Sequence, residues 1–179
     1  MTVKVAINGY GRIGRMVLRA IYEYNRDDQI KVVAINSSHP IETNVHLTKY
    51  DTTHGRFEAN VSSDENNMYV NEDKIVMLAD RNPENLKWSD YDVDIVLECT
   101  GHFTDKAGAS KHFVGGAKKV LISAPGKGDC FYFVRGVNDE DYKNALECFI
   151  ECSNYEGDNP LTFCFIGECY EKLEDYKMA

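Results

Sequence analysis

The chain has no excess of positive charge and no long apolar run. Its 179 residues carry 20 lysines and arginines against 29 aspartates and glutamates, which gives a formal net charge of −9. Non-specific nucleic-acid binding needs clustered basic residues that neutralise phosphates, so this balance argues against that class of protein. No apolar stretch approaches the roughly 20 residues of a membrane-spanning helix. No charged and then apolar leader opens the sequence, so we expect a cytoplasmic protein that binds neither nucleic acid nor membranes.

The negative charge is concentrated at one end. Residues 139–179 contain eleven acids and three bases, a net charge of −8, which leaves −1 for residues 1–138. No histidine follows His112, whereas four of the six cysteines lie in the acidic part: Cys148, Cys152, Cys164 and Cys169. The chain therefore joins two different compositions.

The first 36 residues have the pattern of strand, glycine turn, helix and strand. Residues 3–8 and 30–35 are short apolar runs rich in β-branched residues, typical of buried strands. Between them lie Gly9-x-Gly11-x-x-Gly14 and apolar residues at helical spacing as far as Tyr24. This order predicts a βαβ unit with a parallel sheet.

The same alternation continues along the chain. Short segments with turn signals between residues 57 and 79 indicate an antiparallel excursion from the main sheet. The other expected elements are helices over 41–50 and 105–114, the latter ended by Gly115-Gly116, and strands over 93–98, 119–122 and 131–134. After residue 140 the pattern weakens to a helix over 141–152, a strand over 161–166 and a helix over 168–178. The predicted class is α/β, a Rossmann-type doubly wound, mostly parallel sheet with an antiparallel excursion.

The glycine loop predicts a dinucleotide site. Gly9 permits a tight turn after the strand, Gly11 lets the backbone approach a pyrophosphate, and Gly14 lets the helix pack closely on the sheet. The free N–H groups at the start of the helix then face the anion. We therefore expect NAD or NADP as the cofactor.

The second strand ends without the carboxylate that usually binds the adenosine ribose. Its end reads Ile35-Asn36-Ser37-Ser38, and the next carboxylate is Glu42. Because no negative charge there repels a 2′-phosphate, we expect NADP to be tolerated or preferred. The alternative is that Glu42 or a backbone group serves the ribose and that NAD still binds.

Six segments follow one another in order over about residues 3–146. They are Val5 to Arg15, Lys49-Tyr50-Asp51-Thr52-Thr53-His54-Gly55-Arg56-Phe57, Glu98-Cys99-Thr100-Gly101-His102-Phe103-Thr104, Gly116 to Val120, Ser123-Ala124-Pro125-Gly126-Lys127 and Gly136-Val137-Asn138. Together they resemble the glyceraldehyde-3-phosphate dehydrogenase family. The Asn36-Ser37 ending is similar to the NADP-using branch and to erythrose-4-phosphate dehydrogenase relatives. Strictly NAD-dependent members have Asp at the position of Ser37.

The resemblance implies a cofactor site made of Asn8, Gly9, Gly11, Arg12, Ile13, Gly14, Asn36, Ser37, Arg81, Thr100, Gly101, Phe103 and Ser123. Arg12 and Ile13 would give N–H groups to the pyrophosphate, and Asn36 and Ser37 would lie at the adenosine ribose. The adenine would lie near Arg81, the nicotinamide near Ser123, and the crevice would be lined by Thr100, Gly101 and Phe103. Alternatively, Thr100 and Gly101 cap a strand, Phe103 belongs to the core and Arg81 is a solvated charge. His54 would be a structural loop residue and not a catalytic base.

The family's catalytic residues are not recognisable here. Its chemistry needs a cysteine thiolate, within Ser-Cys-Thr-Thr-Asn-Cys, and a histidine base. A match without gaps puts the nucleophile position at Asn154, and Cys152 lies two residues short of it. We therefore interpret residues 1–146 as an NAD(P)-binding domain and 147–179 as an acidic, cysteine-rich tail unlike the family. We assign no catalytic residue and expect a chain truncated before the catalytic cysteine and inactive alone.

Three interpretations of the tail remain open. Cys148, Cys152, Cys164 and Cys169 could form a zinc or redox site, but their spacing is not that of paired C-x-x-C motifs, so we expect free thiols and assign no metal site. The tail could be an accessory segment that covers the sheet edge, or an out-of-frame reading of the family gene after Leu146. A non-catalytic scaffold that binds a partner through the tail is the alternative function. A complementing catalytic domain or a homo-oligomer also stays open.

Overall fold

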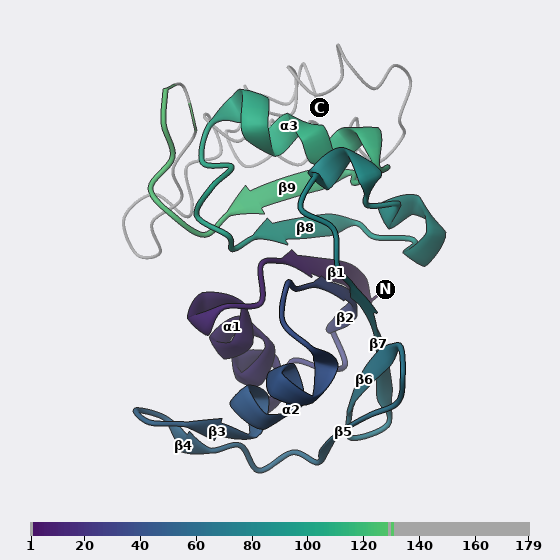
Figure 1. Ribbon diagram of the computed structural model, residues 1–179, viewed down its shortest axis with the longest axis vertical. Helices are drawn as coiled ribbons and strands as arrows, with labels where there is room; N and C mark the ends of the chain where they lie inside the picture. The colour runs from purple at the N-terminus through teal and green to yellow at the C-terminus, as the bar shows by residue number, and fades with distance from the viewer. Residues whose placement is uncertain (1, 129, 131–179) are drawn as a thin grey trace, which may run out of the picture. The chain divides into compact units, whose positions relative to one another are not determined.

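The computed structural model describes residues 2–128 and 130, which form a seven-stranded sheet flanked by helices (Figure 1). The strand order is β5 (Val61–Ser63), β6 (Asn67–Val70), β7 (Asp73–Leu78), β2 (Ile30–Asn36), β1 (Val3–Asn8), β8 (Ile95–Glu98) and β9 (Lys119–Ile122). The α-helices are α1 (Arg12–Glu23), α2 (Ile41–Lys49) and α3 (Lys106–Val114), and two short 3₁₀ helices are η1 (Pro83–Asn85) and η2 (Trp88–Tyr91). A separate hairpin pairs β3 (Tyr50–Asp51) with β4 (Gly55–Arg56).

The pairing confirms the predicted sheet. β1 lies parallel to both β2 and β8, and β2–β7 and β8–β9 are also parallel pairs. The predicted excursion is present as the antiparallel pairs β5–β6 and β6–β7. Its strands extend the main sheet, because β7 returns parallel to β2. Asp64 holds the β5–β6 turn by accepting bonds from the N–H groups of Asn66 and Asn67, at 2.9 and 2.8 Å.

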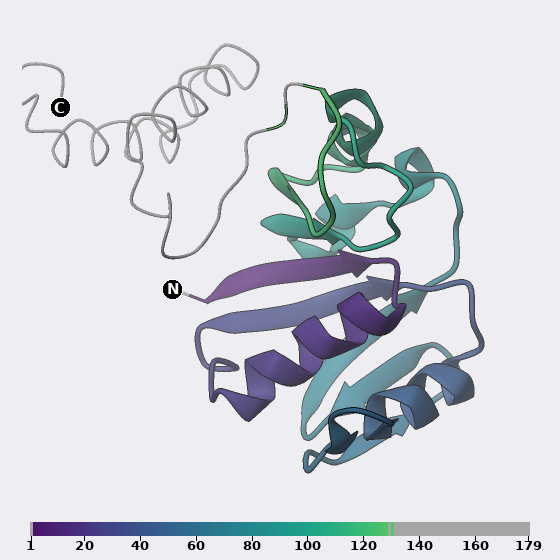
Figure 2. The same ribbon diagram turned by 90° about the vertical axis from the view of Figure 1, so that its left-hand side faces the viewer.

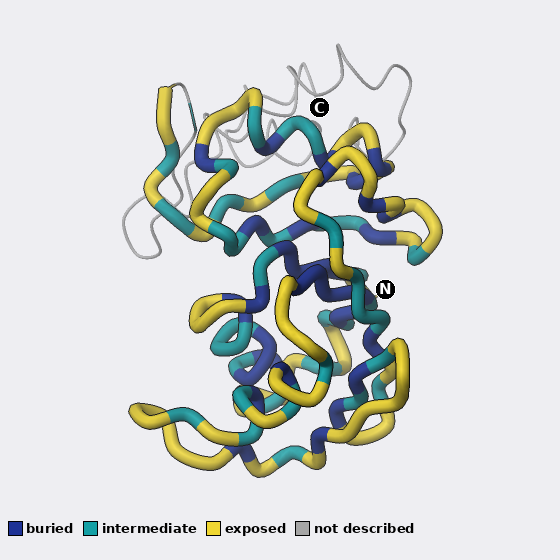
Figure 3. The backbone as a smooth tube through the Cα atoms, in the orientation of Figure 1, coloured by how far each residue is buried: buried dark blue, intermediate teal, exposed yellow. Residues whose placement is uncertain are grey.

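Each face of the sheet packs against its own core. On one face Ile7 and Ile35 contact α1 through Leu18, and Met68 and Ile75 extend this core under β6 and β7. The opposite face carries Ala6, Ala34 and Val96 against Trp88, with Leu86, Val93 and Ala117 completing the cluster. Figures 2 and 3 show α1 against the buried strands β1 and β2. Helices therefore cover both faces, as the doubly wound class requires.

Helix ends follow the expected signals. Asp105 caps α3 by accepting a 2.6 Å bond from the Gly108 N–H, and Gly115 with Gly116 follows the last turn, Gly116 at a φ of +89°. No helix among the described residues is long and apolar enough to cross a bilayer. The strand expected over 131–134 and the elements expected beyond it lie outside the described residues.

The β3–β4 hairpin is a feature that the sequence pattern did not predict. Arg19 of α1, only 2% exposed, donates to the carbonyl oxygens of Gly55 and His54, at 3.0 and 3.2 Å. Its guanidinium also lies 5.2 Å from the ring centroid of Phe57 and pairs with Glu23. A buried arginine on α1 therefore holds the hairpin in place.

Candidate functional site

The parallel strands bring the predicted site residues to one edge of the sheet. Ser37 follows β2, Gly9 follows β1, Thr100 follows β8 and Ser123 follows β9. The chain moves from β1 to β2 on one side, while β8 lies on the other side of β1, so the strand order reverses at the β1/β8 junction. Ligands of open α/β sheets bind in the crevice outside such a reversal.

The three glycines have the geometry that a dinucleotide loop needs. Gly9 has a φ of +92°, and a Cβ there would lie 2.6 Å from the Thr100 nitrogen, so only glycine fits. A Cβ on Gly14 would lie 2.5 Å from the carbonyl oxygen of Gly9, because α1 packs closely on the turn. Gly11 differs, since a Cβ there would meet no atom within 4 Å. The open space at Gly11 fits a group that approaches from outside the protein.

The start of α1 carries no internal cap. Its N-cap residue, Gly11, offers no side-chain bond, and the first turn contains no acidic residue. Arg12 and Ile13 are exposed, Ile13 by 52%. The Arg12 guanidinium is bound elsewhere, since it donates to Asp51 at 3.1 Å and to Thr53 at 2.8 Å. The residues present therefore fit a pyrophosphate that would be held by backbone N–H groups.

Asn8 and Asn36 connect the strand ends. Both side chains are buried, and Asn36 Nδ2 donates to Asn8 Oδ1 at 2.7 Å. Asn36 also bonds the backbone of Asp80 after β7, donating to its carbonyl oxygen at 2.7 Å and accepting from its N–H at 2.9 Å. These bonds set the positions of three neighbouring strand ends, and direct contact with a cofactor stays a prediction for both residues.

Glu98 is a buried site residue that the sequence analysis did not single out. Its Oε1 accepts bonds from the Thr100 N–H, at 2.8 Å, and from the Thr100 hydroxyl, while Oε2 accepts from Asn8 Nδ2 and lies 3.0 Å from His112 Nε2. Trp88 Nε1 lies 3.1 Å from His112 Nδ1. Because an indole N–H can only donate, Nδ1 accepts, and Nε2 carries the proton that the neutral His112 donates to Glu98.

Glu98 is therefore surrounded by donors. Burial acts to raise the pKa of this carboxyl, but the hydrogen bonds from His112, Thr100 and Asn8 outweigh it and hold the pKa below its ordinary value. The carboxylate is ionised and determines where the turn after β8 lies.

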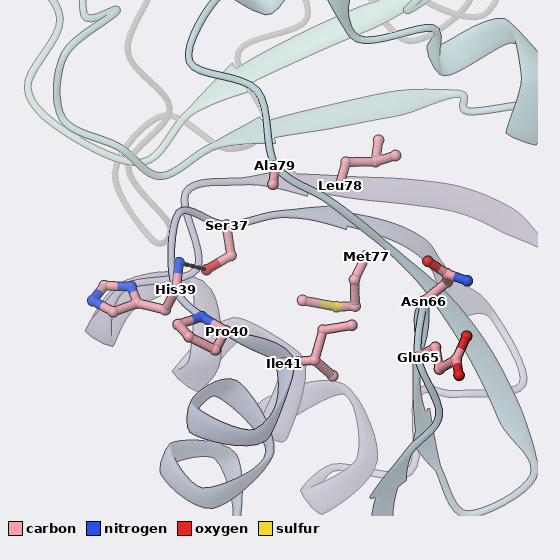
Figure 4. Close-up of a pocket in the computed structure, with 9 residues that line it drawn as sticks. All are labelled: Ser37, His39, Pro40, Ile41, Glu65, Asn66, Met77, Leu78 and Ala79. Carbon is pink, nitrogen blue, oxygen red and sulfur yellow. Dashed lines mark hydrogen bonds between the residues drawn. The ribbon is translucent and has the colours of Figure 1, made fainter.

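A cavity of about 250 Å³ lies beside Ser37 (Figure 4). The Ser37 hydroxyl donates to Asn44 Oδ1 at 3.2 Å and accepts from the His39 N–H at 3.3 Å. Glu65, from the turn between β5 and β6, is the carboxylate in the lining, and Glu42 does not contribute. The lining residues are Ser37, His39, Pro40, Ile41, Glu65, Asn66, Met77, Leu78 and Ala79.

The remaining predicted residues lie around the same edge. Arg81 is exposed after β7, and Gly101 is exposed with a φ of +74° after β8. Phe103 is half-buried, with its ring edge-on to the His112 ring at a centroid distance of 6.4 Å. Ser123 is exposed, and its hydroxyl donates to the carbonyl oxygen of Glu98 at 3.1 Å.

Comparison with known proteins identifies the family. Residues 3–106 match the family described as "Glyceraldehyde 3-phosphate dehydrogenase, NAD binding domain". The chain belongs to the glyceraldehyde-3-phosphate dehydrogenase family. A relative from Cupriavidus necator, "Glyceraldehyde-3-phosphate dehydrogenase, chromosomal", is 58% identical over 139 residues, which are 77% of this chain and 41% of the relative. "Glyceraldehyde-3-phosphate dehydrogenase 2" from Bacillus subtilis is 51% identical over 142 residues, 79% of this chain and 41% of the relative.

These matches confirm the predicted family and place the glycine loop and β8 in its NAD-binding domain. The chain spans 41% of the length of both relatives. His54, for which the resemblance implies a structural role in a loop, lies in the β3–β4 hairpin, and its Nδ1 is 3.2 Å from Asp51 Oδ1. We predicted no metal site, and Cys148, Cys152, Cys164 and Cys169, which we expect to be free thiols, lie outside the described residues.

Proposed function

We propose that the chain binds NAD or NADP across the carboxyl edge of the sheet and supplies the cofactor half of an aldehyde-oxidising dehydrogenase. The observation that carries this proposal is the glycine loop, in which Gly9 and Gly14 admit no side chain while Gly11 faces open space. The uncapped start of α1 provides the N–H groups for the pyrophosphate.

The cofactor would lie with its two halves on opposite sides of β1. The adenosine ribose belongs at the end of β2, beside Asn36 and Ser37, because the residue after the second strand contacts the ribose in this class of site. The nicotinamide half would then extend over Thr100 and Ser123, after β8 and β9. When bound, the nicotinamide accepts the hydride of an oxidised aldehyde.

Use of NADP is a finer part of the proposal. Ser37 puts a hydroxyl where a carboxylate would repel a 2′-phosphate, and the adjoining cavity gives space for a substituent on the ribose. Because Ser37 carries no charge, we expect NADP to be tolerated, and because Glu65 supplies a carboxylate to this cavity, we expect NAD to remain usable. This choice would place the chain in the NADP-tolerant, erythrose-4-phosphate dehydrogenase-like branch.

We propose residues 1–146 as the cofactor domain and 147–179 as a distinct acidic tail. Because the sequence of 179 residues contains no Ser-Cys-Thr-Thr-Asn-Cys segment, we propose that it does not oxidise aldehydes alone. A complementing catalytic domain from another protein would have to supply the thiolate and the base, and a homo-oligomer of this chain stays a separate expectation about its assembly. Sequencing the gene downstream of codon 146 tests whether the tail is an out-of-frame reading. Presence of the Ser-Cys-Thr-Thr-Asn-Cys segment in another frame would support this interpretation. Absence of the segment from both other frames would eliminate the interpretation.

A partner-binding scaffold is the alternative function, and one observation favours it. In the described part of the chain, Leu121 on the outermost strand is 49% exposed, and Phe113 and Val114 of α3 are 48% and 71% exposed. Such apolar surface is typical of a docking face. It suits a catalytic domain as well as an unrelated partner.

Titration of the purified chain with NADH and with NADPH tests the proposal. We expect saturable binding of NADH and of NADPH, measured by the rise in nicotinamide fluorescence. We expect no dehydrogenase turnover with glyceraldehyde 3-phosphate, phosphate and NAD. Absence of binding at millimolar cofactor would refute the cofactor domain. Turnover by the chain alone would refute the assigned inactivity.

A further inference from the structure

A buried negative charge lies under the crevice on the side of β8. Glu98 is 0% exposed, and the ion pairs of the described residues give it no lysine or arginine partner. Its four donors are the N–H and hydroxyl of Thr100, the amide of Asn8 and the ring of His112. All four are uncharged, because Trp88 holds His112 in its neutral form. The cluster therefore keeps the full charge of one carboxylate in a region of low dielectric.

Glu98 contacts the two residues over which the nicotinamide half would lie. It accepts the Thr100 N–H at 2.8 Å through its side chain. Its carbonyl oxygen accepts the N–H and the hydroxyl of Ser123, at 3.0 and 3.1 Å. Since the adenosine ribose would lie at β2, on the far side of β1, Glu98 would lie on the side of the crevice that takes the other half of the cofactor.

We propose that Glu98 is a positioning residue of the crevice whose negative charge favours the oxidised over the reduced dinucleotide. This inference rests on the proposed function. The two cofactor forms differ by one positive charge, which the nicotinamide ring carries when oxidised and loses on accepting a hydride. A carboxylate on this side of the crevice would attract the oxidised form, whose ring is positively charged, and would leave the uncharged reduced ring unaffected.

The size of the effect follows from Coulomb's law. Two unit charges about 10 Å apart at an effective dielectric constant of about 20 change an equilibrium constant by roughly tenfold. Because Glu98 is buried, dissolved salt screens this attraction much less than it screens exposed charges.

The test compares the affinities for NAD⁺ and NADH in the full chain by isothermal titration calorimetry. Glu98→Gln keeps the size of the side chain and removes the charge, and we expect the preference for NAD⁺ to fall about tenfold. Thr100→Val removes the hydroxyl bond to Glu98 and keeps the charge of Glu98. It should therefore lower the affinities for NAD⁺ and for NADH by the same factor. Glu72→Gln is the matched control, because it removes an exposed charge at the amino end of β7, the opposite edge of the sheet, and should leave the ratio unchanged.

The outcomes separate this inference from the proposed function. If the wild-type chain binds neither form, the proposed function is wrong. If it binds both and Glu98→Gln keeps the wild-type ratio, the role of Glu98 is overturned. If Glu98→Gln does not fold, the ratio of the wild-type affinities for NAD⁺ and NADH is the test. We expect the preference for NAD⁺ to persist from about 0.05 to about 0.5 M salt. A ratio that falls to one over this range overturns the proposal.

Discussion

Replacing Gly9 by alanine should destabilise the fold and abolish the site at once. The new Cβ would lie 2.6 to 2.8 Å from the backbone nitrogen and Cα and the side-chain Cγ2 of Thr100, where a flexible side chain cannot simply move away. A φ of +92° adds strain of about 1–2 kcal/mol for a residue with a side chain, and overpacking adds about 1–3 kcal/mol. We expect a loss of about 3 kcal/mol in the free energy of unfolding, or roughly 10 °C in Tm.

Gly11→Ala is the matched control for this prediction. The same chemical change occurs two residues away, at a φ of −76° and with no atom within 4 Å of the new Cβ. Stability should change by less than about 1 kcal/mol, and the sign could be favourable because alanine restricts the unfolded chain. Dinucleotide affinity should nevertheless fall, because the new methyl group occupies the space in which the pyrophosphate would approach the backbone.

Urea denaturation followed by tryptophan fluorescence measures both effects. The chain has one tryptophan, Trp88, which is 0% exposed and reports on the described unit. A Gly9→Ala variant as stable as the wild type would refute the packing argument. A Gly11→Ala variant that binds NADH as well as the wild type would refute the role of the open space at Gly11.

Three further outcomes follow from the structure. Ser37→Asp should lower the affinity for NADPH at least about tenfold, because the added carboxylate repels the 2′-phosphate, and should leave the affinity for NADH equal or higher. Fluorescence titration measures both affinities, and equal losses for the two cofactors would contradict this expectation. Arg19→Ala should cost about 2–3 kcal/mol in urea denaturation, because it leaves the hairpin carbonyls and Phe57 without their partner, whereas Arg26→Ala, which removes an exposed bond to Gln29, should cost little. Hydrogen bonds from Tyr69, Asn66 and Asn67 lower the pKa of Asp64 to about 2, so the stability it contributes is complete above its unfolded pKa near 3.8 and is lost as the pH falls from there towards 2. Urea denaturation between pH 6 and pH 3 should therefore show a weaker pH dependence for Asp64→Asn, and an unchanged dependence would count against this bonding.

The elements that could be predicted from the sequence are those with strong local signals. The strand, glycine turn and helix of residues 3–23 follow from apolar runs and glycine spacing, and the structure gives these elements nearly the expected bounds. Asp105 before α3 and the two glycines after it also mark a helix by local chemistry alone. The family resemblance predicted a cofactor site of thirteen residues, and the structure places these residues around the carboxyl ends of the parallel strands.

What could not be predicted depends on contacts between distant residues. Glu98 and His112 are 14 positions apart, and Trp88 lies 24 positions before His112. No periodicity in the sequence therefore shows that these three side chains are connected by buried hydrogen bonds. The hairpin at residues 50–56 was missed because its strands are two residues long and are held by Arg19 on another element. Asn8 and Asn36 were expected to contact the cofactor, whereas their bonds to each other became visible only with the sheet register.

Hydrogen exchange at the start of α1 tests the central claim most directly. The amides of residues 12–14 should exchange rapidly in the free chain and about tenfold or more slowly at saturating NADH, because bound pyrophosphate would engage them. The amides of the β6–β7 turn, at the opposite edge of the sheet, provide the internal control. Protection at residues 12–14 is the predicted result, and unchanged exchange there at saturating cofactor would contradict the assignment of this loop as the dinucleotide site.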